Sequence, residues 1–143
     1  MIYTEKTKRA MKLMFEAHKD QTDKAGLPYV FHPFHLAEQM TCEAAAVAAL
    51  LHDVAEDTDI TLDELRGMGF GDDVCDALAL LTHDGRVPYM DYVAAIKHNP
   101  IARAVKLADL RHNSDLTRLD AVDEKALARA EKYRKAIAFL EEA

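Results

Sequence analysis

Residues 42–57 read CEAAAVAALLHDVAED, and this stretch sets the fold that the rest of the chain completes. Its first part is apolar on nearly every side of a helix, a pattern typical of a helix buried at the centre of a domain. Four polar residues, His52, Asp53, Glu56 and Asp57, follow at its end. The stretch therefore predicts a buried central helix over residues 43–57 that ends in a polar cluster.

Turn residues divide the rest of the chain into short helical segments, and no segment alternates polar and apolar residues as a strand would. We expect Thr4 to cap a helix that runs to about Gln21, and Pro33 to open a helix that runs to about Met40. Further helices are expected over residues 61–68, 72–81, 88–99, 100–118 and 123–142. The prediction is an all-α domain of seven or eight helices over residues 1–143.

The composition of the 143-residue chain excludes several classes of protein. Half of the residues are hydrophobic, which is enough for the core of one domain. The 18 Lys and Arg against 25 Asp and Glu give a net charge of −7, which argues against a nucleic-acid partner. A small anion can still bind where cations gather. Without a signal peptide or an apolar run of roughly 20 residues, we expect no membrane partner.

The two cysteines, Cys42 and Cys75, stand 33 positions apart, and neither belongs to a CxxC pair. This spacing predicts neither a disulfide framework nor a thiolate metal site, and it fits the reducing cytoplasm. The sequence leaves the oligomeric state open.

Residues that commonly bind metal ions gather at three places in the sequence. His32 precedes a predicted helix, the His52-Asp53 pair ends the central helix, and Asp109 lies in a later helical segment. At about 100° per residue, positions 52, 53, 56 and 57 share an arc of about 140° on the helix. Carboxylates crowded beside an apolar surface repel one another, and a divalent cation is the simplest compensation. An ordinary solvated helix end is the alternative.

A second polar face surrounds Asp109, because Asn113 follows it by one helical turn and Lys106 lies nearby. The two histidines and two aspartates form a ligand set without sulfur. Such a set suits an open-sided site for manganese, iron, magnesium or zinc. An open site leaves room for a water molecule, which a bound divalent ion acidifies. Glu56 and Asp57 then lie where they can move protons.

Four stretches of the sequence together resemble a known family: AHKDQTDKAGLPYVFHP (17–33), ALLHDVAEDT (49–58), FGDDV (70–74) and VKLADLRHN (105–113). They resemble the HD superfamily of metal-dependent phosphohydrolases, whose name comes from a His-Asp pair like His52-Asp53. The closer resemblance is to the hydrolase domain of the RelA/SpoT family and its small stand-alone alarmone hydrolases. It extends from about Ala10 to Tyr133.

The resemblance implies a role for each candidate residue. The implied metal ligands are His32, His52, Asp53 and Asp109, and the family metal is typically manganese. Glu56 and Asp57 resemble the pair that activates the attacking water. Lys24 resembles a residue that packs along the guanine base, and Asn113 one that contacts the sugar. Arg129 and Tyr133 resemble a phosphate-binding pair, although an ordinary surface position fits them equally well. The implied reaction removes pyrophosphate from the 3′ position of guanosine tetra- or pentaphosphate (ppGpp or pppGpp).

The sequence departs from the family pattern at two places. Asp23 precedes Lys24 where the family commonly has arginine, and an aspartate cannot stack on a base and would repel an anion. Ser114-Asp115-Leu116 stands where Met-Arg-Thr is common. Two alternatives to alarmone hydrolysis therefore stay open. One is an HD nucleotidase or pyrophosphohydrolase acting on another nucleotide, and the other is a non-catalytic nucleotide-binding HD module.

Overall fold

The computed structural model describes residues 1–142, and the regular secondary structure of this range is helical. The helices over this range are α1 (Glu5–His18), α2 (Phe31–Glu38), α3 (Glu43–Asp57), α4 (Leu62–Gly67), α5 (Asp72–Leu81), α6 (Tyr89–Ile96), α7 (Pro100–Asn113), the 3-10 helix η1 (Leu116–Arg118) and α8 (Glu124–Glu141). Within residues 1–142 the β-type pairing is confined to one isolated antiparallel bridge between Thr22 and Pro28. The all-α prediction is confirmed.

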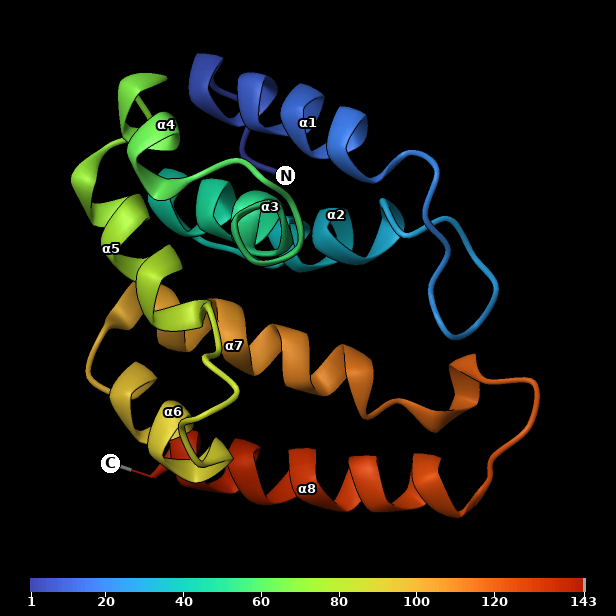
Figure 1. The fold of residues 1–143 in the computed structure, drawn as a ribbon. Helices are drawn as coiled ribbons and strands as arrows, with labels where there is room; N and C mark the ends of the chain where they lie inside the picture. The colour runs from blue at the N-terminus through green and yellow to red at the C-terminus, as the bar shows by residue number, and fades with distance from the viewer. Residues whose placement is uncertain (143) are drawn as a thin grey trace.

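Helix α3 lies at the centre of the molecule, as its sequence predicts. It packs against α1, α2, α5 and α7, and Figure 1 shows it enclosed between α1 and α7. Every residue from position 45 to position 54 is buried. Each large apolar side chain among them contributes about 1.5–3 kcal/mol to stability. Replacing fully buried Leu50 with alanine should cost about 2–5 kcal/mol, because it would leave a cavity in the core.

Helix starts follow the capping residues of the sequence. The Thr4 side chain accepts a hydrogen bond from the Thr7 backbone N–H, and Thr61 does the same for Glu64. Helix α2 begins at Phe31, two residues before Pro33. The ring of Pro33 is tolerated there because the first four N–H groups of a helix have no intrahelical partner.

Helix α7 packs against α3 on one side and α8 on the other (Figure 1). The Asn99 side chain caps its first turn by accepting from the Ala102 N–H. The prediction of one continuous helix over residues 100–118 is wrong, because α7 ends at Asn113. The Asp115 carboxylate accepts the Thr117 N–H and begins the separate 3-10 turn η1. Short polar side chains of this kind compete with helical hydrogen bonds, and they end the helix here.

Two further expectations from the sequence concern membrane-spanning helices and the two cysteines. Over residues 1–142, no helix combines the length and apolar character needed to cross a bilayer. Cys42 is exposed, Cys75 is buried, and both thiols are free.

Candidate active site

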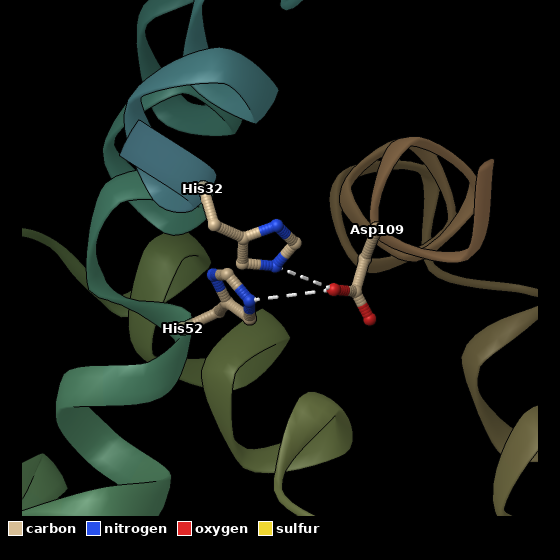
Figure 2. Close-up of side chains that lie close together, drawn as sticks. All are labelled: His32, His52 and Asp109. Carbon is tan, nitrogen blue, oxygen red and sulfur yellow. Dashed lines mark hydrogen bonds and ion pairs between the residues drawn. The ribbon is translucent and has the colours of Figure 1, made fainter. Parts of the chain in front are cut away.

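Three helices bring three metal-binding side chains together in the interior. His32 begins α2, His52 lies near the end of α3, and Asp109 lies on α7, and all three are buried. One ligand atom from each lies within 4.8 Å of the other two. His32 Nε2 is 2.9 Å and His52 Nε2 is 3.8 Å from Asp109 Oδ1, and Figure 2 shows both rings facing this carboxylate. We call this set the triad.

The hydrogen bonds of His52 fit a divalent cation at the triad. Its Nδ1 lies 2.6 Å from the Ala49 carbonyl oxygen, which can only accept, so Nδ1 carries the proton of the neutral ring. The lone pair then lies on Nε2. This atom is buried and has no hydrogen-bond partner among the described residues. An orphaned imidazole lone pair beside a carboxylate is the donor arrangement that a divalent metal ion satisfies.

Asp53 lies at the edge of the triad. Its Oδ2 is 3.1 Å from His52 Nε2 and accepts a hydrogen bond from the Tyr29 hydroxyl. Burial raises the pKa of Asp53 well above its usual value, and the negative charge of Asp109 raises it further. A bound cation would remove both penalties. The structure thus gathers all four predicted ligands, and the role of Asp53 as a ligand stays a prediction.

Asp109 is held in its ionised form by its neighbours. Lys106 Nζ donates to its Oδ2 at 3.0 Å, and Asn113 Nδ2 donates to its Oδ1 at 3.0 Å. Burial by itself would raise the pKa of Asp109, but the Lys106 ammonium and the hydrogen bond with His32 outweigh it and hold the pKa well below its usual value. Despite its own burial, Lys106 has a raised pKa because of Asp109. This carboxylate is therefore a permanent anionic donor.

His112 contacts the triad through the ring of His32. Its Nδ1 lies 2.7 Å from His32 Nδ1, and the two rings stack with centroids 4.9 Å apart. Burial lowers the pKa of His112 to about 4, and the nearby Arg118 guanidinium adds to this effect. His112 is therefore neutral at physiological pH and fixes the ring of His32 without adding charge.

Tyr29 is a residue of this site that sequence reasoning missed. Besides donating to Asp53, it packs edge-on against the buried ring of His18, with centroids 5.1 Å apart. His18 in turn contacts Gln21 through Nδ1 at 3.0 Å. No periodic signal marked it, because Tyr29 lies in the turn before α2 and its partners Asp53 and His18 come from α3 and α1.

A pocket of about 550 Å³ opens beside the triad. Five carboxylates line it, those of Asp23, Asp53, Glu56, Asp109 and Asp115, and five cationic side chains line it as well. The cationic side chains of this lining are Lys24, Lys106, Arg118, Arg129 and Lys132. The predicted substrate residues Lys24, Asn113, Arg129 and Tyr133 all belong to it. Lys106 and Arg118 are paired with Asp109 and Asp23, so Lys24, Arg129 and Lys132 are the cations of the lining that are available to an anionic ligand.

The two predicted catalytic acids occupy different positions. Glu56 lines the pocket, and its Oε1 accepts the backbone N–H of His83 at 3.4 Å. Asp57 is the last residue of α3, is exposed, and is not part of the lining. Glu56 is thus the better placed of the pair, and the role of both residues stays a prediction.

Asp23 does not act as a free anion in the pocket. Its Oδ1 accepts the backbone N–H groups of Ala25 and Leu27 at 2.9 and 3.0 Å. Its Oδ2 pairs with Arg118 at 2.9 Å, and both side chains are mostly buried. The expectation of simple charge repulsion from Asp23 overlooked this pairing. The aspartate shapes the loop that carries Lys24 and fastens it to η1.

These observations define a class of protein. A helical domain that joins a histidine in the first turn of α2, a His-Asp pair on α3 and an aspartate on α7 beside a pocket has the arrangement of an HD-type domain. No family model matches the sequence. Individual relatives do. The guanosine-3′,5′-bis(diphosphate) 3′-pyrophosphohydrolase of Aquifex aeolicus is 32% identical over 93% of this chain, and the mouse enzyme of that name, MESH1, is 39% identical over 73%.

The chain belongs to the HD-type family of these guanosine-3′,5′-bis(diphosphate) 3′-pyrophosphohydrolases. It spans 20% of the length of the Aquifex protein and 66% of the mouse protein. A solved structure described as a metazoan orthologue of SpoT that hydrolyses ppGpp superimposes with a TM-score of 0.78 at 24% identity. That match covers 98% of this chain and 87% of the other, and it confirms the fold.

Proposed function

We propose that this chain is a divalent-metal-dependent phosphohydrolase that removes the 3′-pyrophosphate of guanosine tetra- or pentaphosphate, giving GDP or GTP. The observation that carries the proposal is the buried triad at the side of a pocket lined by five cations. The names of the relatives support the choice of substrate. The compartment proposed is the cytoplasm, following the cysteine pattern of the sequence.

His32, His52, Asp53 and Asp109 would hold the metal ion, and we propose that it is manganese. Nitrogen and oxygen donors without sulfur favour a metal of this type over a structural zinc. The ion, when bound, would lower the pKa of water and withdraw charge from phosphoryl oxygens. The orphaned Nε2 of His52 is the feature of the chain that best fits this role.

Glu56 would act as the proton carrier of the reaction. The oxygen of water forms a bond to the phosphorus attached to the ribose 3′-oxygen, and the bond between that phosphorus and the 3′-oxygen breaks. One proton of the water passes to the Glu56 carboxylate and then to the 3′-oxygen that leaves. Lys106, paired with Asp109, keeps a positive charge beside the reacting phosphate. Asp57 would support Glu56 from the neighbouring position.

Four residues around the pocket would position the nucleotide. Lys24 packs along the base, and Asn113, tied to Asp109 through its Nδ2, offers its side chain to the sugar. Arg129 and Tyr133 lie one turn apart on α8 and would grip phosphate oxygens.

The direct test is to incubate the purified protein with Mn²⁺ and ppGpp and to identify the products by ion-exchange chromatography. We expect GDP and pyrophosphate in equal amounts, and no turnover in the presence of a chelator. Substrate that stays intact during a long incubation with metal would contradict the proposal.

A second candidate is hydrolysis of a different nucleotide by the same centre. The observation that favours it is that Asp23, held by Arg118, stands before Lys24 where the family commonly has an arginine that can stack on a base. A panel of nucleotides without a 3′-diphosphate distinguishes the two candidates. Faster cleavage of any of them than of ppGpp would favour the second.

A further inference from the structure

The hydroxyl of Tyr89 is a polar group that the proposed reaction does not yet use. Tyr89 begins α6 directly after Pro88 and lines the pocket. Its Oη is buried and has no hydrogen-bond partner among the described residues. Leaving a buried hydroxyl without a hydrogen-bond partner is unfavourable. A group that carries such a cost next to a binding pocket is a candidate for contact with the ligand.

Tyr92, one turn further along α6, is a tyrosine whose hydroxyl has a structural role. Its hydroxyl donates to the Leu81 carbonyl oxygen at 2.7 Å and so ties α6 to the end of α5. Tyr92 is not part of the pocket lining. The two tyrosines share a helix and an aromatic cluster, and they differ in whether the protein itself satisfies the hydroxyl.

The ring of Tyr89 is held in a fixed orientation. It packs against the rings of His83 and Tyr92, with centroids 6.0 and 5.9 Å away. Lys132 Nζ lies 4.0 Å from the ring centroid, a cation–π contact that joins α6 to α8. A ring fixed on three sides presents its hydroxyl at one place, so a ligand there meets a preorganised donor.

The electrostatic surroundings of the hydroxyl belong to the pocket. Burial raises the pKa of Tyr89, so the phenol keeps its proton and can donate. The charged or ionisable groups close enough to affect it are those of Lys106, Tyr133 and Asp109, all of which line the pocket. A hydroxyl donor in a pocket that Lys106 and Lys132 also line favours an anionic acceptor over a neutral one.

We propose that Tyr89 is a substrate-binding residue whose hydroxyl donates a hydrogen bond to an oxygen of the pyrophosphoryl group. Lys132 fixes the ring and adds positive charge beside the same group. The identity of the whole substrate rests on the proposed function, but recognition of a pyrophosphate anion does not, because it depends only on this wall of the pocket.

The test compares Tyr89→Phe with Tyr92→Phe, since both remove one hydroxyl from α6. Binding of pyrophosphate is measured by calorimetry at a fixed Mn²⁺ concentration, KM and kcat are measured with ppGpp, and stability is measured by urea unfolding. Tyr89→Phe should weaken pyrophosphate binding and raise KM roughly tenfold, the usual effect of one hydrogen bond to a charged group. Its unfolding midpoint should stay the same or rise. Tyr92→Phe should lower the midpoint and leave pyrophosphate binding unchanged.

Unchanged pyrophosphate affinity in Tyr89→Phe would overturn the proposal, and so would a loss of stability as large as that of Tyr92→Phe. A wild-type protein that binds no pyrophosphate would overturn it as well. A wild-type protein that binds pyrophosphate but leaves ppGpp intact would refute the proposed function alone, because the affinity difference between the two variants would still test Tyr89.

Discussion

The candidate metal centre and the outer wall of the pocket are built from different kinds of structure. The triad and Asp53 lie on three helices that pack directly against one another, and each of the four residues is at most 8% exposed. The outer wall comes from the loop before α2, from η1 and from α8, and its side chains are half-buried or exposed. We use "outer wall" for Lys24, Arg118, Arg129, Lys132 and Tyr133.

The difference in packing suggests a division of tasks: the buried metal centre would carry out the reaction, and the outer wall would recognise the nucleotide. The positions of the triad are fixed by the same packing that forms the core, so the ligands cannot move without repacking α3. The outer wall depends on a few polar contacts between segments distant in sequence, such as the Asp23–Arg118 pair. We expect substitutions there to change nucleotide binding without disturbing the metal centre, and the departures from the family pattern at Asp23 and Ser114 lie outside that centre.

The largest effect is expected at the metal centre. Asp53→Ala should reduce kcat by more than about 10³-fold and abolish Mn²⁺ binding, because an anionic donor is lost. Calorimetric titration with Mn²⁺ and a turnover assay measure the two effects. Asp59→Ala, which changes an exposed aspartate just after α3, is the control and should retain both. Full metal binding in Asp53→Ala would remove Asp53 from the ligand set.

The next effect separates the two acids at the end of α3. Glu56→Gln should retain Mn²⁺ and lose about 10²–10⁴-fold in kcat, because the amide cannot accept the proton of the attacking water. Asp57→Asn should lose less, since Asp57 does not line the pocket. A Glu56→Gln protein that no longer binds Mn²⁺ would make Glu56 a ligand instead. A larger loss in Asp57→Asn would reverse the order of the two residues.

Local pattern in the sequence predicts His52 and Asp53 of the metal centre, whereas His32 and Asp109, which meet across 77 positions, are placed beside them only by the family resemblance. The bounds of α3 follow from local hydrophobicity, and His52 and Asp53 lie on it, so their position is a matter of helical periodicity. The Asp23–Arg118 pair joins residues 95 positions apart, and no periodic signal encodes it. Tyr29 and Tyr89 were missed because each makes a contact that crosses between distant segments, Tyr29 with Asp53 on α3 and Tyr89 with Lys132 on α8.

A third, smaller effect tests whether the Asp23–Arg118 pair positions the outer wall. Asp23→Asn keeps an oxygen for the loop N–H groups but removes the charge that pairs with Arg118. We expect KM for ppGpp to rise about three- to tenfold with kcat little changed, because the loop that carries Lys24 loses its attachment to η1. Steady-state kinetics on Asp23→Asn, Arg118→Met and the double variant measure the coupling, for which we expect about 1 kcal/mol.

The exposed Asp84–Arg86 pair, with side chains 49% and 89% exposed, provides the matched control for that cycle. Pairs of this kind contribute about 0–1 kcal/mol, so Arg86→Met should leave KM unchanged. Additive effects of Asp23→Asn and Arg118→Met on KM would show that the pair does not act as a unit.

The last prediction concerns α6, which lies between the metal centre and the outer wall. The measurement is the free energy of unfolding at alkaline pH. Burial raises the pKa of Tyr92 to about 12, against an ordinary value of about 10. Above pH 10 the unfolded chain releases this proton while the folded chain keeps it, so the free energy of unfolding falls as pH rises from 10 to 12. The expected loss from Tyr92 is about 1 kcal/mol per pH unit in this interval.

Urea unfolding at several pH values between 9 and 12 measures this slope, and other groups contribute to it in every variant. Tyr92→Phe should be less stable than the wild type at pH 8, because the bond to Leu81 is lost, and should show the shallower slope above pH 10. Tyr3→Phe, at a position 64% exposed, should keep the wild-type slope. If the free energy of unfolding fell equally steeply with pH in Tyr92→Phe and the wild type, α6 would have to open to solvent below pH 12. Helix α6 would then behave like the outer wall and not like the core.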